Sequence, residues 1–346
     1  MPIAAGRPGC WRGCLALALL LGLLQVAGAP SAAAEAARLR IGRAPGFAFL
    51  PDYIAEHERL VEKRAQSLGV PALTVEHIEF SGGNVMNGAL LSGDLEVALG
   101  GVPPFLILWA KSRGTRVEVK ALAAVSALPS VLLSRNPRVH GLRDLSDDDR
   151  ISVAAVRASQ VAILLEMACA QTFGPDQWGR LDNQTITMPQ LESLAAMVSA
   201  RSEITTHFTV PPYTYLELKS PSVHAILHSR DVLGGVGTVV VAYARTRFHD
   251  DNPRVMQALF GAMQDARDLI SQEPRRAAAI YLEMTKEPLS VDEIVTLIRD
   301  PDLSYDLTPR ATGTFANFMA DIGSLSHKPP RWQDLFFEEA QGLPGS

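Results

Sequence analysis

The sequence predicts an α/β protein made of two blocks of alternating strands and helices, followed by a helical tail. Short β-prone runs alternate with helical stretches of about 10–15 residues, which implies βαβ units with parallel strands. The alternation starts again near residue 130, and from Asn252 onwards only helical patterns remain. The chain therefore contains two α/β units rather than one long sheet.

The first block begins after residue 38. Its expected strands lie at 39–42, 73–80, 93–99 and 117–125, and its expected helices at 52–67, 84–91 and 105–111. The run at 73–80 alternates apolar and polar residues, as a half-buried strand does. Pro45 and Gly46 end the first strand, and Gly100 to Pro104 end the third.

The second block repeats the pattern, and the tail follows it. Strands are expected at 130–134, 151–156, 184–188, 204–208, 223–228 and 238–244, with a long apolar helix from 160 to 173 and another at 191–200. Tail helices are expected at 253–271, 275–284, 291–298 and 312–322. Asn252-Pro253 is a good helix start, because proline is favoured at the first helical position.

The second block lies inside the chain, which suggests that it is inserted in the first. We expect residues 35–126 and 247–346 to form one lobe and residues 127–246 to form the other. The chain would cross between lobes near 125–129 and again near 245–249, and these two crossings would act as a hinge.

The N-terminus has the pattern of a cleavable signal peptide over residues 1–34. Arg7 and Arg12 precede a short apolar run at 14–24, and small residues follow up to Ala34. The alternative is a membrane anchor, but spanning a bilayer takes about 20 apolar residues, more than this run contains. No later segment is apolar and long enough to span, so we expect an exported, periplasmic chain without stable membrane insertion.

Composition excludes several classes of partner. The formal net charge is −5, and removing Arg7 and Arg12 makes it more negative, so no basic field is available for nucleic acid or anionic membrane. Two of the three cysteines lie in the signal segment, and Cys169 alone in an apolar helix indicates a small core residue. The mature chain of about 310 residues exceeds one core, which favours two domains.

Several strand ends are followed by small or polar residues and a helix start, where ligands of parallel α/β sheets bind. Glycines let the backbone approach a ligand, and the first amides of a helix are unpaired donors that favour anions. Each such loop by itself is equally typical of an ordinary turn or cap, and their recurrence favours a ligand site. The candidate ligand-binding residues are Phe47, Ser81, Gly82, Gly83, Asn84, Gly101, Val102, Ser126, Ser159, Gln160, His207 and Tyr213. Phe47 and Tyr213 would form walls, and His207 and Gln160 would donate or accept hydrogen bonds.

Signatures of enzymes and metal sites are absent from the sequence. It has no G-x-S-x-G, H-E-x-x-H or phosphate-binding-loop motif, and the histidines show no metal-ligand spacing. The glycine-rich run at 234–237 lacks the lysine and opens no helix. We therefore expect no catalytic residue, no metal and no cofactor.

The chain resembles the extracytoplasmic solute-binding proteins of nitrate/sulfonate/taurine-type ABC transporters. The similar segments are LRIG at 39–42, FSGG at 80–83, LLSGDLEVALGGVPP at 90–104, THFTVPPYTYLEL at 206–218, DNPRVMQAL at 251–259 and PPRWQDLFF at 329–337. The resemblance implies the type II periplasmic-binding fold, a monomer, and delivery of a solute from between the lobes to a permease with its ATPase. Ser81, Gly82, Gly83 and Ser159 fall where this family is thought to hold an anion.

The resemblance leaves the ligand open. A sulfonate, a taurine-like compound, nitrate, a carboxylate, a pyrimidine or an aromatic acid all remain, and no arginine clamp is carried over, although Arg157 is near. The same family includes cytoplasmic pyrimidine-precursor synthases of thiamine biosynthesis with a cysteine-rich motif. This sequence departs from them on both points. An exported enzyme and a ligand-sensing module are the alternatives to a transport protein.

Overall fold

The computed structural model describes residues 1–3, 35–199 and 202–346. The predicted signal segment and its cleavage point fall almost wholly outside these residues, as does the end of the helix expected at 191–200. Within the described part of the chain, no helix combines the length and the hydropathy needed to cross a membrane.

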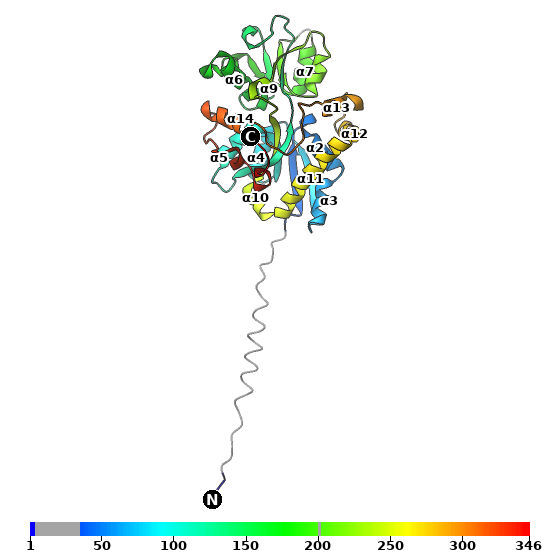
Figure 1. The fold of residues 1–346 in the computed structure, drawn as a ribbon, viewed down its shortest axis with the longest axis vertical. Helices are drawn as coiled ribbons and strands as arrows, with labels where there is room; N and C mark the ends of the chain where they lie inside the picture. The colour runs from blue at the N-terminus through cyan, green and yellow to red at the C-terminus, as the bar shows by residue number, and fades with distance from the viewer. Residues whose placement is uncertain (4–34, 200–201) are drawn as a thin grey trace. The chain divides into compact units, whose positions relative to one another are not determined.

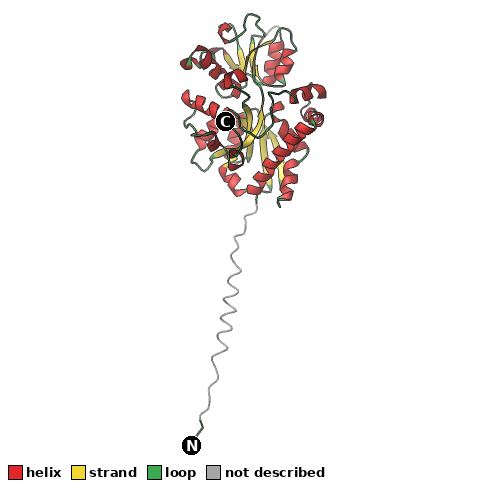
Figure 2. Ribbon diagram, viewed as in Figure 1, coloured by secondary structure: helices red, strands yellow, loops and turns green. Residues whose placement is uncertain are grey.

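In the described residues, ten strands form two five-stranded sheets, surrounded by helices (Figure 2). The first sheet has the order β2-β1-β3-β10-β4 and contains β1 (Arg38–Arg43), β2 (Thr74–Glu79), β3 (Val97–Gly101), β4 (Val119–Ala127) and β10 (Thr238–Arg245). The second has the order β7-β6-β8-β5-β9 and contains β5 (Val131–Ser134), β6 (Ile151–Val153), β7 (Thr185–Thr187), β8 (Thr206–Thr209) and β9 (His224–His228). The whole second sheet is thus inserted between β4 and β10, as the sequence predicts.

The α-helices of the described residues are α2 (Leu50–His57), α3 (Leu60–Ser67), α4 (Gly83–Ser92), α5 (Val102–Ser112), α6 (Gln160–Phe173), α7 (Gln190–Val198), α8 (Tyr213–Leu218), α9 (Ser229–Leu233), α10 (Thr246–Asp251), α11 (Pro253–Gln272), α12 (Pro274–Thr285), α13 (Val291–Ile298), α14 (Thr312–Asp321) and α15 (Glu338–Gln341). Short 3-10 turns lie at Phe47–Phe49, Leu142–Asp144, Pro175–Gln177, Asp182–Gln184 and Trp332–Leu335. The long α11 packs against α2 and α3 (Figure 1).

Strand periodicity puts a core on each face of the first sheet. On β10, Val240, Ala242 and Ala244 join the core formed with α2, α3 and α11, whereas Val241 and Tyr243 join the core formed with α4 and α5. Successive side chains of a strand point to opposite faces, so this one apolar run serves both layers. The second sheet is also covered twice, since Leu132 packs on the α6 side and Leu133 in the cluster with Met197 of α7.

Two expectations about the secondary-structure elements are wrong. The helix expected at 52–67 is two helices, because Arg59 between them adopts a left-handed backbone with φ of 53°. The sheets are mixed rather than parallel: β10 runs antiparallel to β3 and β4, and β5 runs antiparallel to β8 and β9. The alternation of strands and helices indicates how long the connections are. It does not indicate which sheet a strand joins or in which direction the strand runs.

The expected lobe boundary at 246/247 is also wrong, because the alternation did not reveal which sheet the strand at 238–244 joins. The run at 238–244 was assigned to the second lobe, but β10 pairs with strands of the first sheet. The chain returns to the first sheet within residues 229–237, between β9 and β10, and not near 245–249. The outward crossing is short, since only residues 128–130 separate β4 from β5.

The folded unit begins at the first residue after the predicted cleavage point. The Glu35 carboxylate accepts hydrogen bonds from the Val255 amide at 2.8 Å and from the Arg254 side chain at 2.8 Å, at the start of α11. The Ala36 amide donates to the Asn252 side chain at 2.7 Å. A carboxylate at a helix start is stabilising, so these contacts fix the entry of β1.

A buried charge network fixes the other end of β1. The Arg43 guanidinium lies 2.7 Å from the Asp52 carboxylate and 2.6 Å from that of Glu56, and His77 Nδ1 lies 3.1 Å from Asp52. Burial by itself would raise the pKa of Asp52, but the positive charges of His77 and Arg43 outweigh it and hold that pKa below 3.8. Burial would lower the pKa of His77, and the charge of Asp52 overcomes this and raises the pKa above 6.5.

We predict that Asp52→Asn destabilises the fold by about 3–5 kcal/mol, because Arg43 and His77 lose their buried counter-charge. Urea unfolding at pH 7 measures the change. Asp148→Asn, at an exposed carboxylate without an ion pair or hydrogen bond to the described residues, is the matched control and should change the free energy of unfolding by less than about 0.5 kcal/mol. Equal effects of the two variants would contradict the assignment.

The His77 contribution should depend on pH in one direction. Its folded pKa is raised, so its stabilisation is complete below about 6.5 and is lost as pH rises through the folded value. The difference in unfolding free energy between the wild type and His77→Gln should therefore shrink from pH 6 to pH 9. A difference that grows with pH would contradict it.

Candidate functional site

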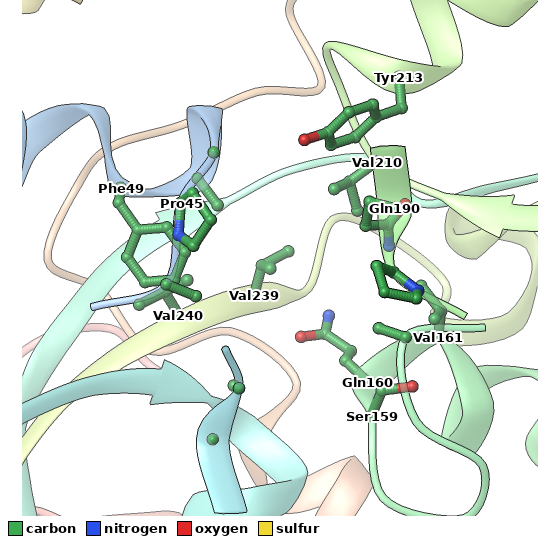
Figure 3. A pocket seen from close by; sticks show the side chains of 18 of the residues that line it. Pro45, Phe49, Ser159, Gln160, Val161, Gln190, Val210, Tyr213, Val239 and Val240 are labelled. Atoms are coloured by element: carbon green, nitrogen blue, oxygen red, sulfur yellow. The ribbon is translucent and has the colours of Figure 1, made fainter. Parts of the chain in front are cut away.

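A cavity of about 530 Å³ is lined by residues of both sheets and their loops (Figure 3). From the first sheet come Ala44, Pro45, Gly46, Phe47, Ala48, Phe49, Ser81, Gly82, Gly83, Gly101, Pro104, Val239 and Val240. From the second come Ser130, Ala154, Ser159, Gln160, Val161, Thr187, Pro189, Gln190, Leu191, Val210, Pro211 and Tyr213. None of these lining residues is charged, and most are apolar, as in pockets for organic molecules.

Eight of the twelve predicted site residues line this cavity, namely Phe47, Ser81, Gly82, Gly83, Gly101, Ser159, Gln160 and Tyr213. They come from loops that are far apart in sequence, and the strand ends bring them together. Figure 3 shows Pro45 and Phe49 on one side and Gln160, Gln190 and Tyr213 on the other. The Phe47 ring packs against Tyr281 and Tyr305, so Phe49 is the better wall.

The other four predicted residues do not line the cavity. Asn84 is exposed on α4, and Val102 is fully buried in the core. Ser126 is buried in β4, where its backbone pairs with that of Val240. His207 is fully buried, and its Nδ1 lies 2.6 Å from a carboxylate oxygen of Glu217 in α8. That pair joins β8 to α8 and so supports the segment that carries Tyr213, which is a structural role rather than the predicted contact.

Helix starts supply hydrogen-bond donors to the cavity wall. The first intrahelical bond of α4 is made by the Met86 amide and that of α7 by the Ser193 amide, so the amides before them are free to donate. In α6 the Ser159 hydroxyl caps the Ala162 amide, and the amides of Gln160 and Val161 remain. The start of α5 differs, because Pro103 and Pro104 have no N–H. The starts of α4, α6 and α7 thus present amide donors. The loop at Gly101 provides no such donors at the start of α5.

Two glycines shape this wall for different reasons. Gly46 has a φ of 127°, which side chains of L-residues rarely permit, and it turns the chain between β1 and the segment with Phe49. Gly83 is needed for space: a Cβ there would lie 3.1 Å from the Pro104 ring. The Ser81–Gly83 loop is therefore glycine-rich partly because α4 and α5 pack closely.

The lining contains residues that the sequence did not reveal. Gln190 begins α7 after a strand, the same arrangement that singled out Ser159, and it could have been found by that signal. Val239 and Val240 could not, because β10 was assigned to the wrong lobe. Burial raises the pKa of the Tyr213 hydroxyl to about 12, so it stays protonated.

The lining of the cavity contains no lysine, arginine or histidine, and the described residues offer no metal site. Arg157 lies beside Asp182 at 2.5 Å, outside the lining, so the nearest candidate for an arginine clamp is already paired. Among residues 35–199 and 202–346, no group of three or more histidine, cysteine, aspartate or glutamate side chains could hold a metal ion.

Ser159 should matter for stability as a cap. Ser159→Ala removes the acceptor at the start of α6 and should cost about 1 kcal/mol in the free energy of unfolding. Ser81→Ala is the control, because Ser81 is exposed and its hydroxyl makes no hydrogen bond to the described residues. Chemical denaturation of both variants tests this; equal stability of the two would contradict the capping role.

Comparison with known proteins identifies the fold. No protein-family model and no curated protein sequence matches the chain. Among solved structures, an alkanesulfonate-binding protein from Xanthomonas axonopodis pv. citri bound to MOPS is 18% identical, with a TM-score of 0.67 over 86% of this chain and 96% of that one. The periplasmic aliphatic sulphonate binding protein of Escherichia coli is 17% identical, with a TM-score of 0.66 over 90% and 95%. The periplasmic nitrate-binding protein of Synechocystis PCC 6803 is 15% identical, with a TM-score of 0.65 over 87% and 84%. The chain therefore has the two-lobed periplasmic-binding-protein fold that the sequence predicts.

Proposed function

We propose that this protein is the extracytoplasmic solute-binding component of an ABC importer. The observation that carries the proposal is the uncharged cavity of about 530 Å³ that both sheets line together. The three structural neighbours are named as sulfonate- or nitrate-binding proteins, and a further neighbour from Staphylococcus aureus is named as the ligand-binding component of an ABC-type import system. These names support a binding role over a catalytic one.

The proposed mechanism is closure of two lobes around the solute, followed by docking on a permease with its ATPase. We assign residues 35–127 and 238–346 to one lobe and 131–228 to the other, so that the hinge segments are 128–130 and 229–237. The C-terminal segment bonds beside both crossings: the Ala127 amide donates to the Ser304 carbonyl at 2.7 Å, and the Thr238 amide to that of Arg310 at 3.0 Å. These bonds would limit closure to a rotation near the hinge.

The proposed solute is a small organic molecule with an apolar body. In this conformation the cavity of about 530 Å³ has room for on the order of 15–20 water molecules, which is far more than the volume of a four-atom anion such as nitrate. A carboxylate, sulfonate or other acceptor-rich group would lie at the starts of α4, α6 and α7, where free amides point. The apolar body would lie against Phe49, Val239 and Val210.

We further propose that the chain acts in the periplasm as a monomer after removal of residues 1–34. The anchoring of Glu35 on α11 supports a folded unit that begins at this point. The negative net charge supports the absence of nucleic-acid partners.

A thermal-shift screen with a small-metabolite library tests the function. A solute at a hundredfold excess over its dissociation constant stabilises the protein by about 2.7 kcal/mol and should raise the melting temperature by several degrees. Val239→Trp should abolish the shift, because the indole fills the cavity beside β10. Val198→Trp, at an exposed position of α7 outside the lining, should keep it.

The function is contradicted if no compound of the library stabilises the wild type. The cavity assignment is contradicted if Val239→Trp binds the same compounds as the wild type with unchanged affinity in calorimetry.

A further inference from the structure

Two glutamines of the cavity wall differ in the hydrogen bonds that they already make. Gln160, the first residue of α6, is 8% exposed, and its buried Oε1 has no hydrogen-bond partner among the described residues. Its Nε2 donates no hydrogen bond to the described residues either. Gln190, the first residue of α7, accepts a hydrogen bond from the buried Thr209 hydroxyl through Oε1 at 2.5 Å, which leaves its Nε2 to donate. Both side chains lie opposite Pro45 and Phe49 (Figure 3).

An unpaired buried acceptor is costly, and folded proteins rarely keep one without a reason. The neighbouring groups do not satisfy Gln160 Oε1. The Ser159 hydroxyl already donates to the Ala155 carbonyl at 2.8 Å, and the Thr209 hydroxyl is used by Gln190. The terminal torsion of a glutamine is broad, so a small rotation presents Oε1 to the cavity. Water in the open cavity can donate to Oε1, so a solute that displaces this water from Gln160 has to supply a donor in its place.

This requirement separates classes of ligand. An ionised sulfonate, carboxylate or nitrate has acceptor atoms only, so it can use the helix-start amides but leaves Gln160 Oε1 unpaired. A group with an N–H beside a carbonyl or ring nitrogen pairs with both atoms of the Gln160 carboxamide. The lining has no charged side chain to balance a net charge, which an amide-type group does not need.

We propose that the solute presents a planar amide-type edge, as in a carboxamide, a lactam or a cyclic imide, and that Gln160 binds this edge through two hydrogen bonds. Gln190 Nε2 donates to a further acceptor of the same molecule, and Phe49 and Pro45 cover its apolar face. The assignment rests on the proposed solute-binding function and narrows its ligand class.

The test uses matched compounds that share one body and differ in the head group. Benzamide, benzoate and benzenesulfonate form one set, and hexanamide, hexanoate and hexanesulfonate a second. Melting temperatures and calorimetry on the wild type should rank the amide at least tenfold tighter than its acids in one set or both. Gln160→Glu presents acceptors only, so it should weaken amide binding at least tenfold and favour benzamidine, which offers two donors, over benzamide.

Two further variants separate recognition from folding. Gln160→Met keeps the size of the side chain without its polar atoms, and it should lose the amide preference while its melting temperature without ligand shows that the fold is intact. Gln177→Glu makes the same chemical change at an exposed glutamine outside the cavity and should leave the ranking unchanged.

The possible failures are distinguishable. Acids that bind as tightly as the amides, or amide binding that survives Gln160→Glu and Gln160→Met, would overturn the amide assignment while solute binding stands. If neither the matched sets nor the wider library stabilise the wild type, the proposed function falls together with the ligand class.

Discussion

The pairing of β10 between β3 and β4 is the constraint on which the rest of the structure depends. One strand of the first sheet, β10, follows all five strands of the second sheet in the sequence. The two sheets therefore do not correspond to two separate halves of the chain. β10 lies antiparallel to both neighbours, and its alternating side chains complete the cores on both faces. Its first residues, Val239 and Val240, also enter the cavity wall. One strand thus takes part in the first sheet, in both of its cores and in the cavity wall.

The absence of charged side chains from the cavity wall determines which ligands it can bind. A helix start stabilises a nearby anion by about 0.3–1 kcal/mol when exposed and up to about 2 kcal/mol when partly buried, whereas removing an ionised group from water costs several kcal/mol. An anion would therefore need two or three helix starts acting together. A neutral group needs only hydrogen-bond partners, and Gln160, Gln190 and Tyr213 supply these without charge. For recognition of a solute in this cavity, the side-chain amides of the wall are therefore as important as the helix starts.

Two buried side-chain networks support the segments that form the cavity wall. Arg43 at the end of β1 lies in the network with Asp52, Glu56 and His77, which holds the strand from which the Pro45–Phe49 loop departs. The buried hydrogen bond between His207 and Glu217 joins β8 to α8, the helix that begins at Tyr213. A buried ion pair such as Arg43–Asp52 fixes geometry, because breaking it leaves an uncompensated charge. The wall itself can then stay uncharged and still be rigid.

The sequence by itself determined the local features. Apolar periodicity and helix-start residues located the ten strands of the described residues and the longer helices, but not the short helices α8, α9, α10 and α15. The strand–small residue–helix pattern found eight residues of the cavity wall, because these signals arise from neighbours in the chain. Tertiary structure decided the rest. The direction and sheet of β10 depend on which strands remain unpaired when the chain returns, so the 246/247 boundary, Val239 and Val240 could not be read from local pattern. His207 and Ser126 have suitable chemistry for a ligand, but burial and the position of Glu217 place them in the support of the site. The reason is physical: propensity acts between residues close in sequence, whereas pairing, burial and the cavity arise from contacts between residues far apart in it.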